Sequence, residues 1–198
     1  MKKSTRWLVT AALAIPAVAF ARSEEWERRY TVQAQGGAMA FAGEAATVTQ
    51  PGAAYGVSIS GDIVPWIAGE LGYVGAAYRS EGIVSRTERS DIVENGGLAA
   101  VKVGPPVQWM IKPYALGGLS VQRLTVSKEE NTGGLIGDGT EVRVPVGFGI
   151  ELNPSETGLT VGARGTYAFS TNNNAFDSLG GANAASTWTG LAQLGGRF

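Results

Sequence analysis

The sequence predicts an all-β protein, an eight-stranded antiparallel up-and-down transmembrane β-barrel preceded by a cleavable signal peptide. Three observations lead to this prediction. Side chains alternate between apolar and polar over eight separate stretches, which is the period of a β-strand. The connections between these stretches alternate between long and short, and the first residues read as an export signal. A strand pattern of this kind is typical of barrels that cross a bilayer, because closure pairs every backbone group within the lipid.

The N-terminal segment, residues 1–21, has the three parts of a secretory signal peptide. Lys2, Lys3 and Arg6 form its basic region, an apolar run follows over residues 7–19, and residues 19–21 (Ala-Phe-Ala) form a small-x-small cleavage site. The apolar run is shorter than the roughly 20 residues that a membrane-spanning helix needs. We therefore expect two parts, a signal peptide over 1–21 and an outer-membrane barrel over 22–198.

Composition excludes several classes of chemistry. The chain has no cysteine, so it has no disulfide and no thiolate, and it has no histidine, the commonest general base and metal ligand. No motif indicates a cofactor or a metal centre. Removal of the signal peptide takes only basic residues and leaves a mildly acidic chain, which does not suggest nucleic-acid binding.

The alternation places the expected strands at residues 30–38, 55–63, 66–78, 92–103, 108–126, 141–152, 159–169 and 188–198. The connections after the first, third, fifth and seventh strands are long, including a loop over 43–52, and the others are short. Pro65 marks one short turn because it fixes its own φ and cannot donate to a ladder. The strand over 108–126 has no clearly apolar face, so its orientation stays open.

The strand over 141–152 carries the clearest alternation. Its even positions give an unbroken apolar face: Val142, Val144, Val146, Phe148, Ile150 and Leu152. The last strand, over 188–198, has aromatic residues at both ends of one face and ends on Phe198. We expect these apolar faces to touch lipid.

The polar faces predict a charge network inside the barrel. Taken together, they place six charged side chains in the lumen: Glu70, Lys102, Arg143, Glu151, Arg164 and Arg197. An eight-stranded barrel is just wide enough for side chains to fill. Buried charges must pair, and Glu70 is expected to pair with Arg143 or Arg164.

Aromatic residues fall at two levels. Trp66, Trp109 and Phe198 lie at the short-turn ends of the expected strands, and Phe169 and Trp188 lie at the long-loop ends. This is the arrangement of two interfacial aromatic girdles.

The long loops carry two weaker signals. Asp138 and Glu141 lie among glycines and could supply oxygen ligands to Ca²⁺, but without the dense ladder of a calcium loop a solvated loop is the favoured interpretation. Basic residues near the outer rim could contact lipid A phosphates or could be a solvated rim: Arg79, Arg86, Arg89, Arg123 and Lys128.

The region from residue 30 to Phe198 resembles the small outer-membrane β-barrel family, typified by OmpA-like and OmpX-like proteins. The resemblance rests on the phrase over 64–73 (VPWIAGELGY), the phrase over 112–114 (KPY) and the terminal Phe198. It implies a charge network in the lumen, as in OmpA-like barrels, and makes Phe198 an assembly signal read by the barrel-assembly machinery. We expect no peptidoglycan-binding domain beside the barrel, so the tethering role of full-length OmpA proteins is not carried over.

Several functions remain compatible with this sequence. Outer-membrane lipases, acyltransferases and proteases use a catalytic histidine, which this chain lacks, so we expect no enzyme. We expect a monomeric structural or surface-interaction barrel that contacts outer-membrane lipid and lipopolysaccharide, with the network closing the lumen. The alternatives are a narrow gated pore and a secreted, soluble, lipocalin-like barrel that binds a small apolar ligand.

Overall fold

The structure is a computed structural model that describes residues 30–80, 90–105, 110–127, 136–152, 158–171 and 185–198. The predicted signal peptide lies outside these residues. The elements follow in the order β1 (Tyr30–Phe41), η1 (Gly43–Thr47), β2 (Gly52–Val64), β3 (Ile67–Arg79), β4 (Asp91–Val103), β5 (Ile111–Val126), β6 (Gly139–Leu152), β7 (Leu159–Ser170) and β8 (Thr187–Arg197). No helix among the described residues has the length and apolarity to cross a bilayer.

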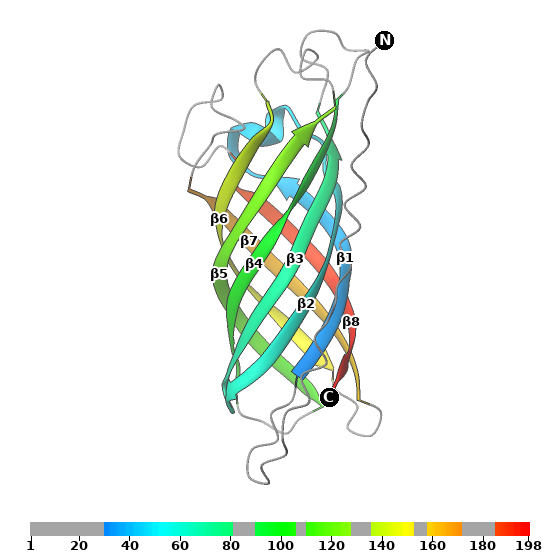
Figure 1. Cartoon of the computed structure of the whole chain (residues 1–198), viewed down its shortest axis with the longest axis vertical. Helices are drawn as coiled ribbons and strands as arrows, with labels where there is room; N and C mark the ends of the chain where they lie inside the picture. Colours follow the sequence, from blue (N-terminus) through cyan, green and yellow to red (C-terminus); the bar gives the residue numbers. More distant parts are fainter. Residues whose placement is uncertain (1–29, 81–89, 106–109, 128–135, 153–157, 172–184) are drawn as a thin grey trace, which may run out of the picture.

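The eight strands form one closed antiparallel barrel in which each strand pairs with its neighbours in sequence. Figure 1 shows the first strand, β1 in blue, beside the last, β8 in red. β1 pairs with β2 on one side and with β8 on the other. The pairing of β1 with β8 is the closing seam of the barrel. Two backbone hydrogen bonds between Tyr30 and Phe198, of 2.8 and 3.0 Å, complete this seam where β1 begins and β8 ends. The predicted up-and-down barrel is confirmed.

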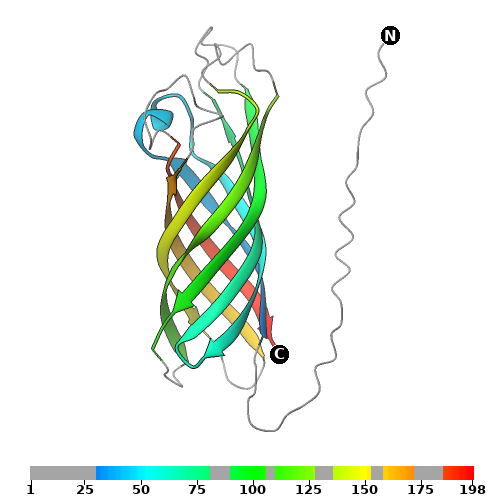
Figure 2. The ribbon, with the colours of Figure 1, turned by 60° about the vertical axis from the view of Figure 1, so that its left-hand side comes forward.

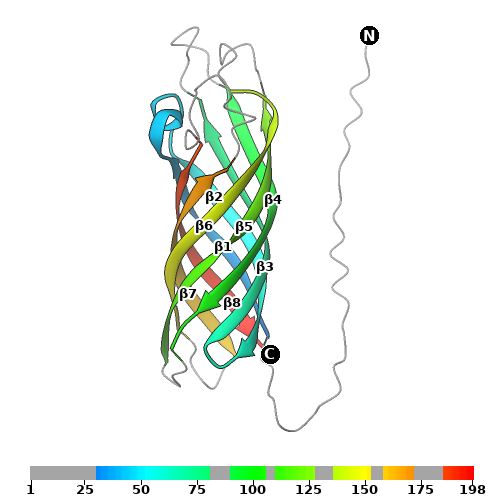
Figure 3. The same ribbon diagram turned by 90° about the vertical axis from the view of Figure 1, so that its left-hand side faces the viewer.

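The barrel has a short-turn end and a long-loop end (Figures 2 and 3). β1 begins and β8 finishes at the short-turn end, where Pro65 and Trp66 alone join β2 to β3. At the other end the connection over 42–51 contains the 3₁₀ helix η1, which was expected to be a plain loop. Gly43 enters this helix with a φ of 67°, which favours glycine because it has no Cβ to clash.

An apolar belt covers the outside of the barrel. Large apolar side chains point outward from every strand and are at least 38% exposed, among them Val57, Leu71, Val101, Phe148 and Leu194. Neither a helix nor a second sheet among the described residues packs on this surface. A soluble barrel would have buried these side chains because exposure of so much apolar surface to water is unfavourable. The lipocalin-like alternative is therefore wrong, and the belt is a lipid-facing surface.

The interior changes character along the barrel axis, which alternation alone did not predict. Toward the short-turn end it is polar and charged. Toward the long-loop end it is an apolar cap of buried side chains that includes Phe41, Ile92, Leu124 and Ile136. The cap forms where inward positions become apolar near the long-loop ends of the strands. The predicted charge network therefore occupies only part of the lumen.

β5 also takes a definite orientation. Its even positions point inward, among them Tyr114, Leu116 and Ser120, and its odd positions point outward. The pattern was ambiguous because the inward face mixes leucine and tyrosine with polar residues, whereas the outward face includes Pro113 and Arg123. Pairing with β4 and β6 fixes the orientation, since a shift by one residue would turn every side chain to the other face.

Candidate functional site

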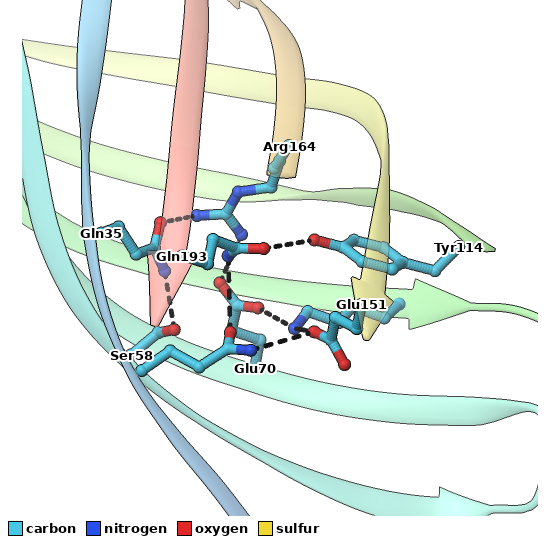
Figure 4. A network of polar contacts seen from close by, with 9 residues as sticks. Gln35, Ser58, Glu70, Tyr114, Glu151, Arg164 and Gln193 are labelled. Carbon is cyan, nitrogen blue, oxygen red and sulfur yellow. Dashed lines mark hydrogen bonds and ion pairs between the residues drawn. The ribbon is translucent and has the colours of Figure 1, made fainter. Parts of the chain in front are cut away.

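The polar part of the lumen toward the short-turn end is one network to which every strand contributes. We call it the lower network, and it consists of Gln33 and Gln35 (β1), Ser58 (β2), Glu70 (β3), Lys102 (β4), Tyr114 (β5), Glu151 (β6), Arg164 (β7) and Gln193 (β8). Figure 4 shows these side chains pointing toward one another from the barrel wall. The network joins strands that lie on opposite walls.

Glu70 is the centre of the lower network. Arg164 donates to its Oε1 over 2.6 Å, and the ammonium of Lys102 lies 2.7 Å from its Oε2. Lys102 also donates to Glu151 over 2.8 Å, so one cation joins two carboxylates. The side chain of Glu70 has no solvent exposure. The two carboxylates and two cations balance in charge, which buried ionic groups require.

Neutral side chains complete the network. Arg164 donates to the amide oxygen of Gln35, and Gln35 donates to Ser58 over 2.7 Å. From β5, Tyr114 donates across the lumen to Gln193 on β8 over 2.9 Å. These hydrogen bonds give partners to buried polar atoms that would otherwise need water molecules as partners.

Glycines on neighbouring strands leave room for the larger network side chains. A Cβ at Gly149 would lie 2.5 Å from the hydroxyl oxygen of Tyr114, and one at Gly162 would lie 3.1 Å from Oε1 of Gln193. Lys102 lies over the Tyr114 ring, with its ammonium 4.9 Å from the ring centre. The inward glycines therefore set which side chains can reach across the lumen.

A second ionic group lies nearer the long-loop end, and we call it the upper cluster. Arg143 donates to Glu94 and, over 2.7 Å, to Gln122. Its guanidinium also lies over the ring of Phe41, at 5.7 Å from the ring centre. Both charged side chains are almost completely buried. The upper cluster therefore lies directly against the apolar cap.

The structure distinguishes between the two arginines that the sequence predicted as alternative partners of Glu70. Arg164 contacts it, whereas Arg143 belongs to the upper cluster and pairs with Glu94. Arg197 was expected in the same network but lies at the short-turn end, where it pairs with Asp62 over 2.9 Å. Its position near the end of β8 carries it past the network, so Arg197 is corrected to a rim residue.

The two candidate calcium ligands also separate. Glu141 is fully buried inside the barrel and accepts a hydrogen bond of 3.0 Å from Ser170. Asp138 accepts a 2.8 Å bond from the backbone N–H of Val126. Asp138 therefore fixes a loop to the end of β5. Among the described residues no group of three acidic side chains could hold a metal ion.

The described girdle residues lie on the outside at the two ends. Trp66 and Phe198 are exposed at the short-turn end, and Phe169 and Trp188 at the long-loop end. Tyr167, which was not predicted, lies between the last two, with ring centres 4.7 Å from Phe169 and 4.6 Å from Trp188. Trp109 lies outside the described residues, as do Arg86, Arg89 and Lys128.

Small hollows lie on either side of the lower network. One of about 70 Å³ is lined by Arg143 and Arg164 and by Ser120, and it separates the lower network from the upper cluster. Another, of about 100 Å³, opens at the short-turn end beside Lys102 and Glu151. The lower network lies between them.

Sequence reasoning missed Glu94 and Gln122, and it assigned Glu141 to a loop site and not to the lumen. All three stand at inward parities of their strands, so the signal was present in the alternation. Glu94 and Glu141 lie close to strand ends, where a carboxylate is usually solvated, and only closure of the barrel shows that they are buried.

Several solved structures share this fold, among them the following three. Neisserial surface protein A has a TM-score of 0.54 and 18% identity, covering 85% of this chain and 95% of that one. Ail of Yersinia pestis, solved with the heparin analogue sucrose octasulfate, has a TM-score of 0.54 and 10% identity, covering 87% of this chain and 100% of that one. OprG, an outer membrane protein of Pseudomonas aeruginosa, has a TM-score of 0.52 and 10% identity, covering 86% and 96%.

No family model and no curated protein matches the chain. The fold and the belt together define the class: this is an eight-stranded transmembrane β-barrel of the outer-membrane type. Barrels of this type meet lipid with an apolar outer band between two aromatic girdles.

Proposed function

We propose that the protein is a non-enzymatic, monomeric outer-membrane scaffold with a closed lumen, which presents its long loops for interactions at the cell surface. The observation that carries this proposal is the lower network, because its side chains come from all eight strands. The apolar cap and the upper cluster support it by filling the other half of the lumen. The hollows on either side of the lower network are too small to form a wide pore.

The long-loop end favours a role at the surface. Short turns face the periplasm in such barrels and the longer connections face outward. In this chain the outer connections are residues 42–51, 80–90, 127–138 and 171–186. The belt and girdles support outer-membrane lipid and lipopolysaccharide as the surrounding partners, and Phe198 on the closing seam is the proposed signal to the barrel-assembly machinery.

Conductance in planar bilayers tests the closed lumen. We expect the wild-type barrel to give only trace current steps. The double variant Glu70→Ala with Arg143→Ala removes a side chain from each ionic layer and should give larger steps than either single variant. Steady, large steps from the wild type would instead support the narrow-pore alternative.

Loop replacement tests the surface role. Short Gly-Ser linkers in place of 81–89 and 172–184 should leave a barrel that still shows heat-modifiable gel mobility. Immobilised heparin is a suitable first probe because the structurally similar Ail was solved with a heparin analogue. Heparin binding by the full chain that the loop-replaced barrel loses would support the proposal, and equal binding by both would place the interaction on the barrel wall.

A further inference from the structure

A polar row lies on the outside wall near the long-loop end. Four residues on β2 to β5 are register partners in one line: Tyr55 with Gly75, Gly75 with Asn95, and Asn95 with Arg123. Tyr55 and Arg123 are exposed on the outer surface. We call this line the outer polar row.

The outer polar row is pre-organised. The Tyr55 hydroxyl donates to Oδ1 of Asn95 over 2.7 Å. Gly75 lies beneath this bond, because a Cβ there would come within 2.6 Å of both the Tyr55 ring and Oδ1 of Asn95. Since the amide oxygen of Asn95 is occupied by Tyr55, the NH₂ group on the same amide is left as a donor.

The guanidinium of Arg123 supplies the charge. Cross-strand partners have Cβ atoms about 4.5–5.5 Å apart, so the Asn95 amide and the Arg123 guanidinium can reach one ligand. Within the described part of the chain Arg123 forms no ion pair, whereas Arg79 nearby pairs with Asp91 over 3.0 Å. The row therefore presents donors and a positive charge but no carboxylate.

The depth of the outer polar row in the membrane indicates which ligand it binds. An outward arginine destabilises a barrel strongly at the bilayer midplane but hardly at all near the interface, so this position suits the headgroup level. Phe169 and Trp188 mark the same end of the barrel. Guanidinium and amide donors on one line fit phosphate oxygens, and the lipid headgroups at the outer face of an outer membrane are those of lipopolysaccharide.

We propose that Tyr55, Asn95 and Arg123 form a binding site for a lipid A phosphate of lipopolysaccharide. This inference rests on the proposed outer-membrane role and assigns its lipid partner to named residues. Arg123 pairs with the phosphate, Asn95 donates a hydrogen bond to it, and Tyr55 fixes the amide through the space that Gly75 leaves.

Lipid retention measured by native mass spectrometry tests the site. The full-length barrel is reconstituted with bisphosphorylated lipid A, with dephosphorylated lipid A, or with phosphatidylglycerol. We expect bisphosphorylated lipid A to be retained best, and Arg123→Gln to lower its retention about tenfold or more, the typical value of a hydrogen bond to a charged group. Arg197→Gln, which removes the same charge at the opposite, short-turn end of the barrel, is the matched control and should leave retention unchanged.

Two glycine variants address the geometry without removing a donor. Gly75→Ala should weaken lipid A retention by displacing Tyr55 and Asn95, whereas Gly97→Ala on β4 should not, because a Cβ there has open space. Equal retention by Arg123→Gln and wild type, or equal retention of phosphatidylglycerol and lipid A, would overturn the site. Conductance of the same variants stays at the wild-type trace level if the closed lumen holds, so the two proposals fail separately.

Discussion

Arg164 on β7 donates to Glu70 on β3 over 2.6 Å, although 94 residues separate them in sequence. In a ring of eight strands these two stand on opposite walls. The pair therefore crosses the lumen, and Lys102 extends it to Glu151 on β6. Two walls are held together here by charge, with little contribution from apolar packing at this level.

The first prediction concerns the cost of breaking this pair. Glu70→Gln leaves Arg164 and Lys102 short of a counter-charge in a buried site, so the free energy of unfolding should fall by about 3–5 kcal/mol. Asp91→Asn at the exposed Arg79–Asp91 pair is the control and should cost about 0–1 kcal/mol. Urea unfolding in lipid vesicles, followed by gel mobility, measures both. Equal losses would mean that the lumen pair is effectively solvated.

The upper cluster should behave as a coupled unit. Arg143→Met and Glu94→Leu each leave one buried charge alone and should each cost about 3–5 kcal/mol. The double variant removes both charges and should cost less than the sum of the two single variants. The same unfolding assay supplies the double-mutant cycle, and strict additivity would contradict direct pairing.

The belt makes a prediction that separates a lipid-facing wall from a water-facing one. Phe148 is 75% exposed midway along β6, so Phe148→Arg should destabilise the barrel in lipid by about 2–4 kcal/mol. Ile63→Arg, near the short-turn end of β2, should cost about 0–1 kcal/mol. On a water-facing wall the first substitution would be neutral or would improve solubility.

Adjacent glycines on β1 offer a sharp packing test. A Cβ at Gly37 would overlap the carbonyl oxygen of Gly190, whereas one at Gly36 would meet open space. Gly37→Ala should therefore cost about 1–3 kcal/mol through overpacking, and Gly36→Ala should be close to neutral. The unfolding midpoint in urea distinguishes them, and indistinguishable midpoints would show that the wall adjusts freely.

Phe198 should matter for assembly more than for stability. Its backbone pairs with Tyr30, but its ring is 78% exposed and packs little. Phe198→Ser should reduce the amount of heat-modifiable barrel recovered from cell membranes while refolding in vesicles remains normal. A matched loss in both measurements would make the ring a structural element and remove its role as a signal.

Particular residues show why the strands could be predicted so well. On β6 the positions from Val142 to Ile150 alternate without a break, and alternation is a local property of the backbone. The strand boundaries moved by a few residues, because β1 continues to Phe41 and β2 begins at Gly52. Those ends depend on ladder partners on the neighbouring strands, which the sequence does not show.

The sequence by itself determined that this chain is a membrane-crossing ribbon of eight strands with a polar face and an apolar face. It predicted both Arg143 and Arg164 as partners of Glu70 and grouped Arg197 with them. Alternation along a strand shows which side of the wall a residue faces, but not its position along the barrel axis. Only the tertiary structure decided the positions along the axis, through the stagger of eight paired strands around the closed barrel. That stagger put Arg164 against Glu70, raised Arg143 to Glu94 beneath the apolar cap, and left Arg197 at the rim with Asp62.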